Sequence, residues 1–353
     1  MNEITIDNKI IGNSQPTYFI ADIAANHDGD LERAKHLCLL AKQSGADAVK
    51  FQHFNAKNFV SDNGFKSLGG KQSHQSNWEK SVYDVYDDAS LPLFWTKELK
   101  NYCDKINVTF FSSPYGLDMI EHLDEYVPAW KIGSGDVNYN VQLKKIAKTK
   151  KPVMLATGAS DLKEVITSIS ILKKYTDKII LMQCNTNYTA KDSNFDFINL
   201  NVLKTYSTLF SDVILGLSDH THGCVTVLGG VSLGARVIEK HFTDDNERTG
   251  PDHPFSMTPT TWKEMVDNTR ILERSLGGCI KKIEDNEKQT VVVQRRALYT
   301  KHDIESGTKI KSSMLEAKRP CVNNSISINH NFDNVVARKF IPKDTCVKWS
   351  DVE

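Results

Sequence analysis

The chain has 353 residues, with 44 basic and 44 acidic side chains, so its formal net charge near neutral pH is zero. No overall field favours nucleic acid or an anionic membrane, and an anionic ligand must therefore be bound by a local site. The seven cysteines lack C-x-x-C spacing and the first residues lack an apolar core of signal-peptide length. No stretch approaches the length of a membrane span. We therefore expect reduced thiols and a soluble, cytoplasmic protein.

Short apolar runs alternate with segments of helical spacing along most of the chain. The runs are residues 18–24, 48–54, 108–113, 129–134, 152–158, 178–185, 213–220 and 236–242. Each is bounded by Gly, Pro, Asn or Asp, which is typical of parallel strands buried on both faces. Helical spacing is clearest in residues 31–44, 97–105, 162–175 and 195–209. The pattern predicts an α/β fold, a (β/α)₈ TIM barrel, which typically needs about 250 residues.

A doubly wound open sheet is the competing fold. It would place a glycine fingerprint, G-x-G-x-x-G, directly after its first strand. Here the first strand leads into AANHDG at residues 24–29, which does not match that fingerprint. The barrel is therefore the favoured fold.

The pattern changes near the C-terminus. Residues 262–276 have the spacing of a last barrel helix, and Gly277-Gly278 and a charged segment follow. Beyond them come short β segments with turn signals. We expect a barrel domain at 1–280, a linker at 281–290 and a small β-rich domain at 291–353. So small a unit is expected to pack on the barrel or on another subunit.

Polar side chains end the predicted strands, where a barrel of this kind gathers its catalytic residues. The candidates from the strands are Asp22, Lys50, Lys131, Ser134, Asp136, Thr157, Thr186, Ser218, His220, Glu239 and His241. Asp252 follows in the loop after the last strand and is either a sugar ligand or a turn-forming residue. The segment 55–92 is longer than an ordinary loop and predicts a lid or a substrate-binding excursion.

Two lysines lie inside apolar strands, Lys50 in AVKFQ and Lys131 in AWKIGSG. A buried ammonium group is costly without a negative partner. The pair therefore predicts an anion at the barrel mouth, whereas a lysine that snorkels past the barrel end explains one such residue better than two. Neutral donors on neighbouring strands are suited to a small dianion or trianion such as a phosphorylated carboxylate.

Two histidines end neighbouring strands, His220 in LGLSDH and His241 in VIEKH. Adjacent strands lie about 4.8 Å apart, so both imidazoles can reach one divalent cation. Two His with oxygen partners and open positions suit Mn, Fe, Co or Zn. The alternative is two histidines satisfied by hydrogen bonds at the barrel rim.

Longer motifs lie around these residues: IADIAANHDGDLERAK, GADAVKFQ, WKIGSGD, LATGAS, GLSDHT, IEKHFT and GPDHPFSM. With them the chain resembles the bacterial sialic acid synthases and their relatives that make legionaminic and pseudaminic acids. GLSDHT followed by IEKHFT and GPDH is the most specific part. The segment with Lys318-Arg319-Pro320 resembles the type III antifreeze-like domain that these enzymes carry.

The resemblance implies a role for each matching residue. His220 and His241 match metal ligands, usually of Mn²⁺, and Lys50, Lys131, Ser134, Ser218 and Thr186 match groups that hold phosphoenolpyruvate. Asn77, Tyr188 and Asp252 match contacts to the sugar. Arg319 matches an arginine that one subunit inserts into the barrel of its partner, which implies a domain-swapped homodimer.

Two positions depart from the family pattern. Relatives have Glu where this chain has Asp22 and Asp136, so each carboxylate is withdrawn by one methylene. Asp22 is expected near the reacting carbon and Asp136 near the sugar. The departure puts plain N-acetylmannosamine in doubt and makes a modified hexosamine plausible as the substrate.

The resemblance implies a nonulosonic acid synthase that condenses phosphoenolpyruvate with an N-acylated hexosamine and releases phosphate. The product is a nine-carbon 3-deoxy-2-keto acid. The alternatives are a plain N-acetylneuraminate synthase, a synthase of seven- or eight-carbon 3-deoxy-keto acids, and a catalytically weak sugar-binding relative. The antifreeze-like domain and Arg319 disfavour the shorter-chain synthases.

Overall fold

The computed structural model describes residues 3–353, apart from the side chain of Asn77. The chain divides into two compact units, of which the first ends at Gly277 and the second is Gly278–Glu353. Helix α12 (Lys288–Gln294) occupies the end of the segment 281–290 that we expected as a linker.

The first unit is built round a parallel sheet. Its strands are β3 (Tyr18–Asp22), β4 (Ala48–His53), β5 (Thr109–Pro114), β6 (Trp130–Ile132), β7 (Val153–Ala156), β8 (Ile179–Cys184), β9 (Ile214–Ser218) and β10 (Val237–His241). They are hydrogen-bonded in the order β5-β4-β3-β10-β9-β8-β7-β6, always in parallel. The end strands β5 and β6 contact each other and close the ring. The predicted barrel is confirmed, and the open doubly wound sheet is excluded.

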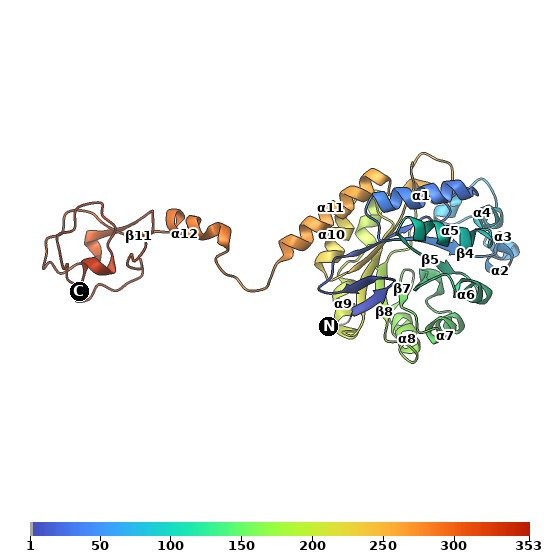
Figure 1. Cartoon of the computed structure of the whole chain (residues 1–353), viewed down its shortest axis with the longest axis horizontal. Coiled ribbons are helices and arrows are strands. Elements are labelled where there is room, and N and C mark those ends of the chain that lie inside the picture. The colour runs from blue at the N-terminus through green and yellow to red at the C-terminus, as the bar shows by residue number, and fades with distance from the viewer. Residues whose placement is uncertain (1–2) are drawn as a thin grey trace. The chain divides into compact units, whose positions relative to one another are not determined.

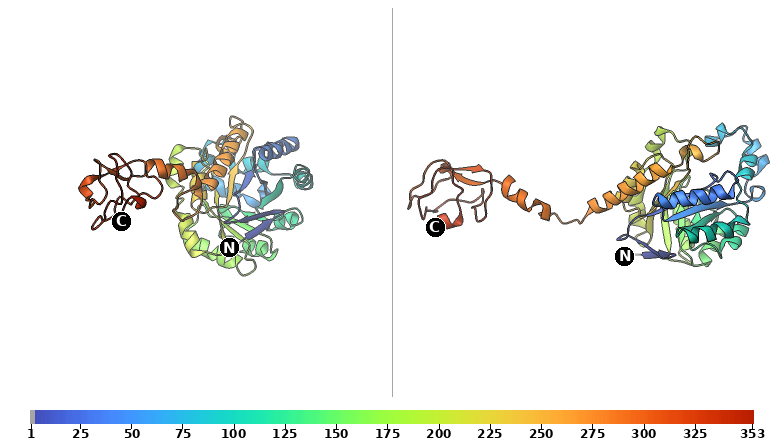
Figure 2. Two further views of the ribbon diagram at one scale, coloured as in Figure 1. Left: turned by 60° about the vertical axis from the view of Figure 1, so that its left-hand side comes forward. Right: turned by 45° about the horizontal axis from the view of Figure 1, so that its top comes forward.

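Helices surround the strands (Figures 1 and 2). They are α1 (Leu31–Gln43), α5 (Trp95–Lys105), α6 (Leu117–Leu123), α7 (Asn140–Lys148), α8 (Leu162–Leu172), α9 (Val202–Leu209), α10 (Val225–Ser232) and α11 (Pro259–Leu276). Side chains fix several starts, as where Asp161 and Glu164 form a capping box at α8. The predicted helix 195–209 is split into the 3₁₀ turn η3 (Asp192–Phe197) and α9, because Asn199 has a left-handed φ of 51°.

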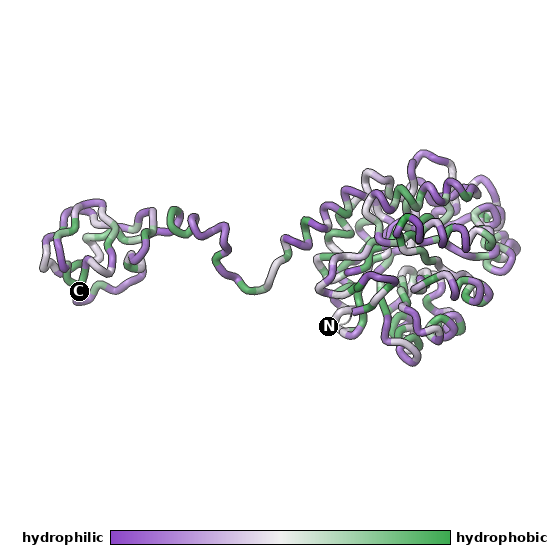
Figure 3. Tube along the Cα trace, in the orientation of Figure 1, coloured by the Kyte–Doolittle hydropathy of each residue, from purple (hydrophilic) through white to green (hydrophobic). Residues whose placement is uncertain are grey.

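Apolar residues concentrate in the strands, as the hydropathy colouring of the trace in Figure 3 shows. The buried core combines side chains from the strands and the helices. Every residue of β3, β5, β8, β9 and β10 is buried. This explains why the strands read as nearly continuous apolar runs rather than as alternating ones.

The sequence analysis missed a hairpin that precedes the barrel. Strands β1 (Glu3–Ile6) and β2 (Lys9–Gly12) pair antiparallel, and Ile4, Ile6 and Ile11 are buried in the barrel core. Lys9 pairs with Asp47, which directly precedes β4, so the hairpin lies at the N-terminal end of the strands. The alternation of EITI and the Asp-Asn turn were the available signals.

The excursion between β4 and β5 is folded. It contains α2 (Ala56–Phe59), α3 (Asp62–Ser67), the 3₁₀ turn η1 (Ser73–Asn77) and α4 (Val82–Ala89). Its aromatic side chains pack on the barrel: Phe59 has its ring centroid 4.8 Å from Tyr115 and 5.6 Å from Phe54. These contacts hold the excursion over the C-terminal ends of the strands.

The second unit has its own core, in which Leu298, Ile304, Ile326 and Val347 are among the buried residues. After α12 it contains the antiparallel strands β11 (Ala297–Thr300) and β12 (Leu315–Lys318). The expectation of a small β-rich C-terminal domain is confirmed.

The hairpin offers a matched pair of stability variants. Ile11 is fully buried, whereas its neighbour Ile10 is 51% exposed. Ile11→Ala should lower the free energy of unfolding by about 2–5 kcal/mol because it leaves a cavity. Ile10→Ala should change it by about 0.5 kcal/mol or less. Denaturant titration of both variants checks this, and equal effects would show that the hairpin contributes nothing to the barrel core.

Candidate active site

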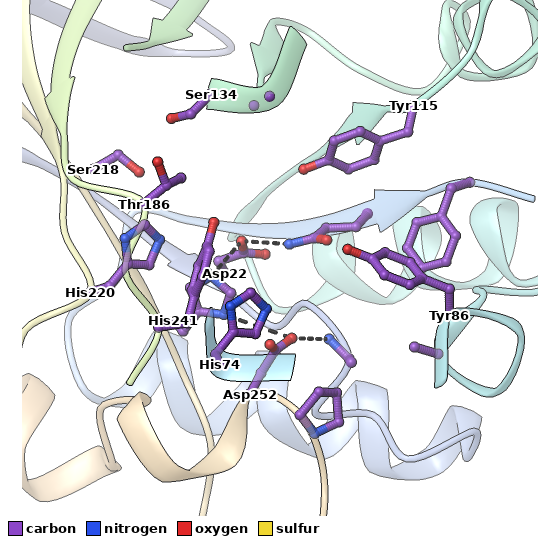
Figure 4. Close-up of a pocket in the computed structure, with 18 of the residues that line it drawn as sticks. Asp22, His74, Tyr86, Tyr115, Ser134, Thr186, Ser218, His220, His241 and Asp252 are labelled. Carbon is purple, nitrogen blue, oxygen red and sulfur yellow. Dashed lines mark hydrogen bonds and ion pairs between the residues drawn. The ribbon is translucent and has the colours of Figure 1, made fainter. Parts of the chain in front are cut away.

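A cavity of about 340 Å³ lies at the C-terminal ends of the barrel strands. Many of the predicted site residues line it: Asp22, Lys50, Lys131, Ser134, Thr186, Tyr188, Ser218, His220, Glu239, His241 and Asp252. Figure 4 labels Asp22, Ser134, Thr186, Ser218, His220, His241 and Asp252 among them. They come from six of the strands or the loops after them. The barrel therefore brings together residues that are far apart in the sequence, as expected for this fold.

A buried cluster of two lysines and two carboxylates forms the floor of the cavity. Lys50 Nζ lies 2.7 Å from Asp22 Oδ2 and 3.3 Å from Glu239 Oε1. Lys131 Nζ lies 3.0 Å from the same Glu239 oxygen. All four side chains are at most 4% exposed. The anion that the lysines require is thus supplied within the chain by Asp22 and Glu239.

The charge cluster shifts the protonation of its members. Burial alone would raise the pKa of Glu239, but Lys131 and Lys50 outweigh it and hold that pKa at about 2. Burial would lower the pKa of Lys50, but Asp22 and Glu239 raise it. Burial lowers the pKa of Lys131, which Glu239 opposes only in part. We conclude that Glu239 stays ionised at neutral pH.

Hydroxyl groups line the side of the cavity next to the lysines. Ser134 Oγ accepts a hydrogen bond from the Gly158 amide at 3.0 Å, and Ser218 Oγ donates to Glu239 Oε1 at 3.3 Å. A Cβ at position 158 would lie 2.6 Å from Thr186 Oγ1 and 3.0 Å from Ser134 Oγ. Glycine is therefore required at position 158, because any larger residue would collide with these two hydroxyl groups.

His220 and His241 lie next to each other, with ring centroids 5.4 Å apart. His220 Nδ1 donates to the carbonyl oxygen of Asn185 at 2.9 Å, which leaves Nε2 with a free lone pair. Burial lowers the pKa of both histidines to about 3, so the rings are neutral at pH 7. His241 Nδ1 is buried without a hydrogen-bond partner among the described residues.

These two rings fit a divalent cation in chemical terms. Neutral imidazoles with free lone pairs are common metal ligands, and the bond from His220 to a backbone carbonyl is the usual way of fixing such a ring. Within residues 3–353 no group of three or more His, Cys, Asp or Glu is assembled as a metal site. A cation held here would therefore need water or substrate as further ligands.

Asp252 joins the loops after the first and last barrel strands. Its Oδ2 accepts from the Ala25 amide at 3.1 Å and lies 3.9 Å from His241 Nδ1. Next to it, fully buried His253 bonds Asp28 at 2.8 Å, which ties the same two loops together. Burial raises the pKa of Asp252 to about 6. This carboxyl group can therefore accept or donate a hydrogen bond near neutral pH.

The sequence analysis did not identify the aromatic wall on the other side of the cavity. It consists of Phe54, Phe59, Trp78, Tyr86 and Tyr115. Apart from Phe54 and Tyr115, these residues belong to the excursion between β4 and β5. Aromatic residues spaced through a long insertion were the available signal, but nothing in the sequence shows that they face the cavity.

Among the side chains that the structure describes, three predicted residues do not line the cavity: Asp136, Thr157 and Arg319. Asp136 is held at 3.1 Å by Gln142 Nε2, so its carboxylate is turned to helix α7. Thr157 donates to the Met182 carbonyl at 2.9 Å and accepts from Tyr206. The Asn77 side chain lies outside the described part of the structure. Arg319 belongs to the second unit.

The fold and the cavity define the class of protein: a TIM-barrel enzyme with a second, small domain, whose site combines paired lysines, hydroxyl groups and neutral imidazoles. Residues 37–281 match the model of the NeuB family, and residues 295–353 match that of the SAF domain. The chain belongs to the NeuB family.

Full-length relatives agree with this assignment. An uncharacterized protein of Methanocaldococcus jannaschii is 36% identical over 100% of this chain and 99% of its own length. The N,N'-diacetyllegionaminic acid synthase of Campylobacter jejuni is 35% identical over 94% of this chain and 99% of its own. The crystal structure of the N-acetylneuraminic acid synthetase of Leptospira borgpetersenii has a TM-score of 0.72 at 28% identity, covering 82% of this chain and 95% of that one. Characterised relatives are thus nonulosonic acid synthases.

In the described part of the chain, the helices are too short or too polar to cross a membrane.

The charge cluster gives a pH-dependent stability prediction. Because the folded-state pKa of Glu239 is about 2 rather than 4.5, its ionised form stabilises the fold above about pH 4.5, and this is lost as the pH falls towards 2. Glu239→Gln leaves Lys131 unpaired and should lower the free energy of unfolding at pH 7 by roughly 3 kcal/mol.

The difference in free energy of unfolding between wild type and Glu239→Gln should be smaller near pH 3 than at pH 7, because the wild-type carboxylate begins to be protonated there and stabilises the fold less. Denaturant titration of both proteins at the two pH values measures it. The exposed Glu264→Gln is the control and should show no gap at either pH. A gap that is equally wide at pH 7 and pH 3 would contradict this role of Glu239.

Proposed function

We propose that this protein condenses phosphoenolpyruvate with an N-acylated hexosamine, forming a nine-carbon 3-deoxy-2-keto acid and releasing phosphate. The observation that carries the proposal is the pair of buried lysines, Lys50 and Lys131, facing a cavity with hydroxyl donors and two neutral imidazoles. The names of the characterised relatives support the same class of reaction.

Phosphoenolpyruvate would lie at the lysine side of the cavity. Its phosphate and carboxylate only accept hydrogen bonds, and Lys50, Lys131, Ser134, Ser218 and Thr186 offer charged and neutral donors. Groups held on short strands lose little freedom on binding, so they orient carbon 3 of phosphoenolpyruvate towards the acceptor aldehyde.

The acceptor sugar would lie between Asp252, Tyr188 and the aromatic wall. Carbon 3 of phosphoenolpyruvate forms a bond to the aldehyde carbon, whose oxygen takes up a proton. Water adds at carbon 2, and the bond from carbon 2 to the phosphate oxygen then breaks. Asp22 would position this water or take its proton; donors from Lys50, Gln52 and Ala24 fix its carboxylate.

His220 and His241 would hold a divalent cation such as Mn²⁺, which would supply Lewis-acid polarisation of the aldehyde. The neutral rings and the unpartnered Nδ1 of His241 support this assignment.

A modified hexosamine is our favoured acceptor. Asp22 replaces the longer Glu of relatives, and a carboxylate drawn back by one methylene loses a hydrogen bond of about 1 kcal/mol unless the ligand fills the gap. Asp136 does not support this argument, because Gln142 holds its carboxylate outside the cavity. The aromatic wall provides apolar surface for an added acyl or methyl group.

Phosphate release tests the proposed reaction. Purified protein with Mn²⁺ and phosphoenolpyruvate should release phosphate only when an N-acylated hexosamine is added. A diacetamido-trideoxyhexose should give a higher kcat/KM than N-acetylmannosamine, and product mass should equal acceptor plus phosphoenolpyruvate plus water minus phosphate. Release with erythrose or arabinose phosphates instead would favour a shorter-chain synthase. No release with any acceptor would favour a sugar-binding relative.

Metal removal tests the histidine pair. Chelation should lower activity by about a hundredfold or more, since the loss of a metal-stabilised transition state is worth several kcal/mol, and Mn²⁺ should restore it. His220→Ala should abolish Mn²⁺ binding in calorimetry. His222→Ala is the matched control, because this exposed histidine pairs only weakly, with Asp192 at 3.3 Å. Full turnover by metal-stripped protein would contradict the assignment.

We further propose that Arg319 completes the site of a partner subunit in a homodimer. Mixing equal amounts of inactive Lys131→Ala and Arg319→Ala chains and letting subunits exchange should restore about a quarter of wild-type activity. About half of the dimers are then heterodimers, and one of the two sites in each heterodimer is intact. Arg338→Ala, which removes an exposed arginine of the same unit, should stay active alone. No recovery despite demonstrated exchange would show that Arg319 does not act across subunits.

A further inference from the structure

The excursion between β4 and β5 contributes a histidine to the cavity. His74 lies in η1 and lines the same space as His241 and Asp252, beside which it is drawn in Figure 4. Its ring centroid is 4.9 Å from Tyr188 and 5.5 Å from Trp78. An imidazole is therefore set between two aromatic rings at the cavity wall.

One ring nitrogen of this histidine is buried without a hydrogen-bond partner. His74 Nδ1 is buried and unpartnered among the described residues. In contrast, both ring nitrogens of the buried His53 and His253 are hydrogen-bonded. A buried polar atom without a partner is unfavourable, so we expect a polar group of a bound ligand to form a hydrogen bond with Nδ1.

The charge of His74 indicates which of the two substrates it contacts. Burial lowers the pKa of His74, so the neutral ring offers one donor and one acceptor. Phosphate and carboxylate groups are drawn instead to the ammonium groups of Lys50 and Lys131. The partner of His74 is therefore a neutral polar group of the acceptor sugar.

An acylamino group has the matching properties. It presents an N–H donor, a carbonyl acceptor and an apolar methyl end, and the rings of Trp78 and Tyr188 beside His74 provide apolar surface for the methyl group. Resting on the function proposed above, we infer that His74 is a specificity-determining residue, which hydrogen-bonds an acylamino group of the acceptor through Nδ1.

The test compares an N-acylated acceptor with the parent hexose that lacks the acylamino group. The preference of the wild type for the acylated sugar, as a ratio of kcat/KM values, should fall about five- to tenfold in His74→Phe, which keeps the ring but loses the nitrogens. His74→Ala should give the same shift without added bulk. His74→Gln should keep most of the preference, because its amide also donates and accepts. The KM for phosphoenolpyruvate should stay within about twofold in all three.

His36→Phe is the matched control, because His36 is exposed on α1 and should leave both kinetic constants unchanged. An unchanged preference in His74→Phe and His74→Ala, with an active wild type, would overturn the role of His74 and leave the proposed reaction intact. An equal loss of phosphoenolpyruvate affinity would also overturn it. A wild type inactive with every N-acylated hexosamine overturns the proposed function and this inference with it.

Discussion

The site depends on one interaction, the buried contact of Lys50 and Lys131 with Asp22 and Glu239. Burying an ion away from water is costly by several kcal/mol even after the protein relaxes, so none of the four charges is stable there alone. The four side chains come from four different strands, and only a closed barrel brings them within hydrogen-bond distance. The geometry of the site is thus tied to the integrity of the barrel.

The same cluster limits how an anion is bound. Burial raises the pKa of Asp22, and Lys50 opposes this shift. As long as both carboxylates are ionised, two positive and two negative charges balance, and the cavity floor has no surplus positive charge. A phosphate monoester carries roughly −1.5 to −2 near neutral pH, and a carboxylate adds to that. Binding phosphoenolpyruvate therefore calls for positive charge from elsewhere. A divalent cation on His220 and His241 and an arginine such as Arg319 would both supply it, which gives the proposed cation and the proposed second subunit a common electrostatic reason.

The barrel and the charged residues could be predicted from the sequence, because both follow from local rules. Continuous apolar runs indicated strands buried on both faces, and a lysine inside such a run indicated a charge that needs a partner. What the sequence did not reveal was the identity of that partner: Glu239 lies far along the chain from both Lys50 and Lys131. The placement of Asp136 depends on a similar non-local contact: it follows a strand as predicted, but Gln142 bonds its carboxylate and it is not among the residues that line the cavity.

The sequence predicted the excursion but not the surface that it forms, because a linear pattern does not show that Phe59 and Tyr86 pack on Phe54 and Tyr115, which follow the flanking strands β4 and β5. The division of the site between strand residues and excursion residues has a functional consequence. Strand residues such as Lys50 cannot change without leaving a buried charge unpaired, whereas His74 and Trp78 can be exchanged with little effect on the barrel core. A family built this way can keep one way of holding phosphoenolpyruvate and vary its acceptor sugar through the excursion, so acceptor preference is to be sought in residues 55–92 as well as in strand-end residues such as Asp22.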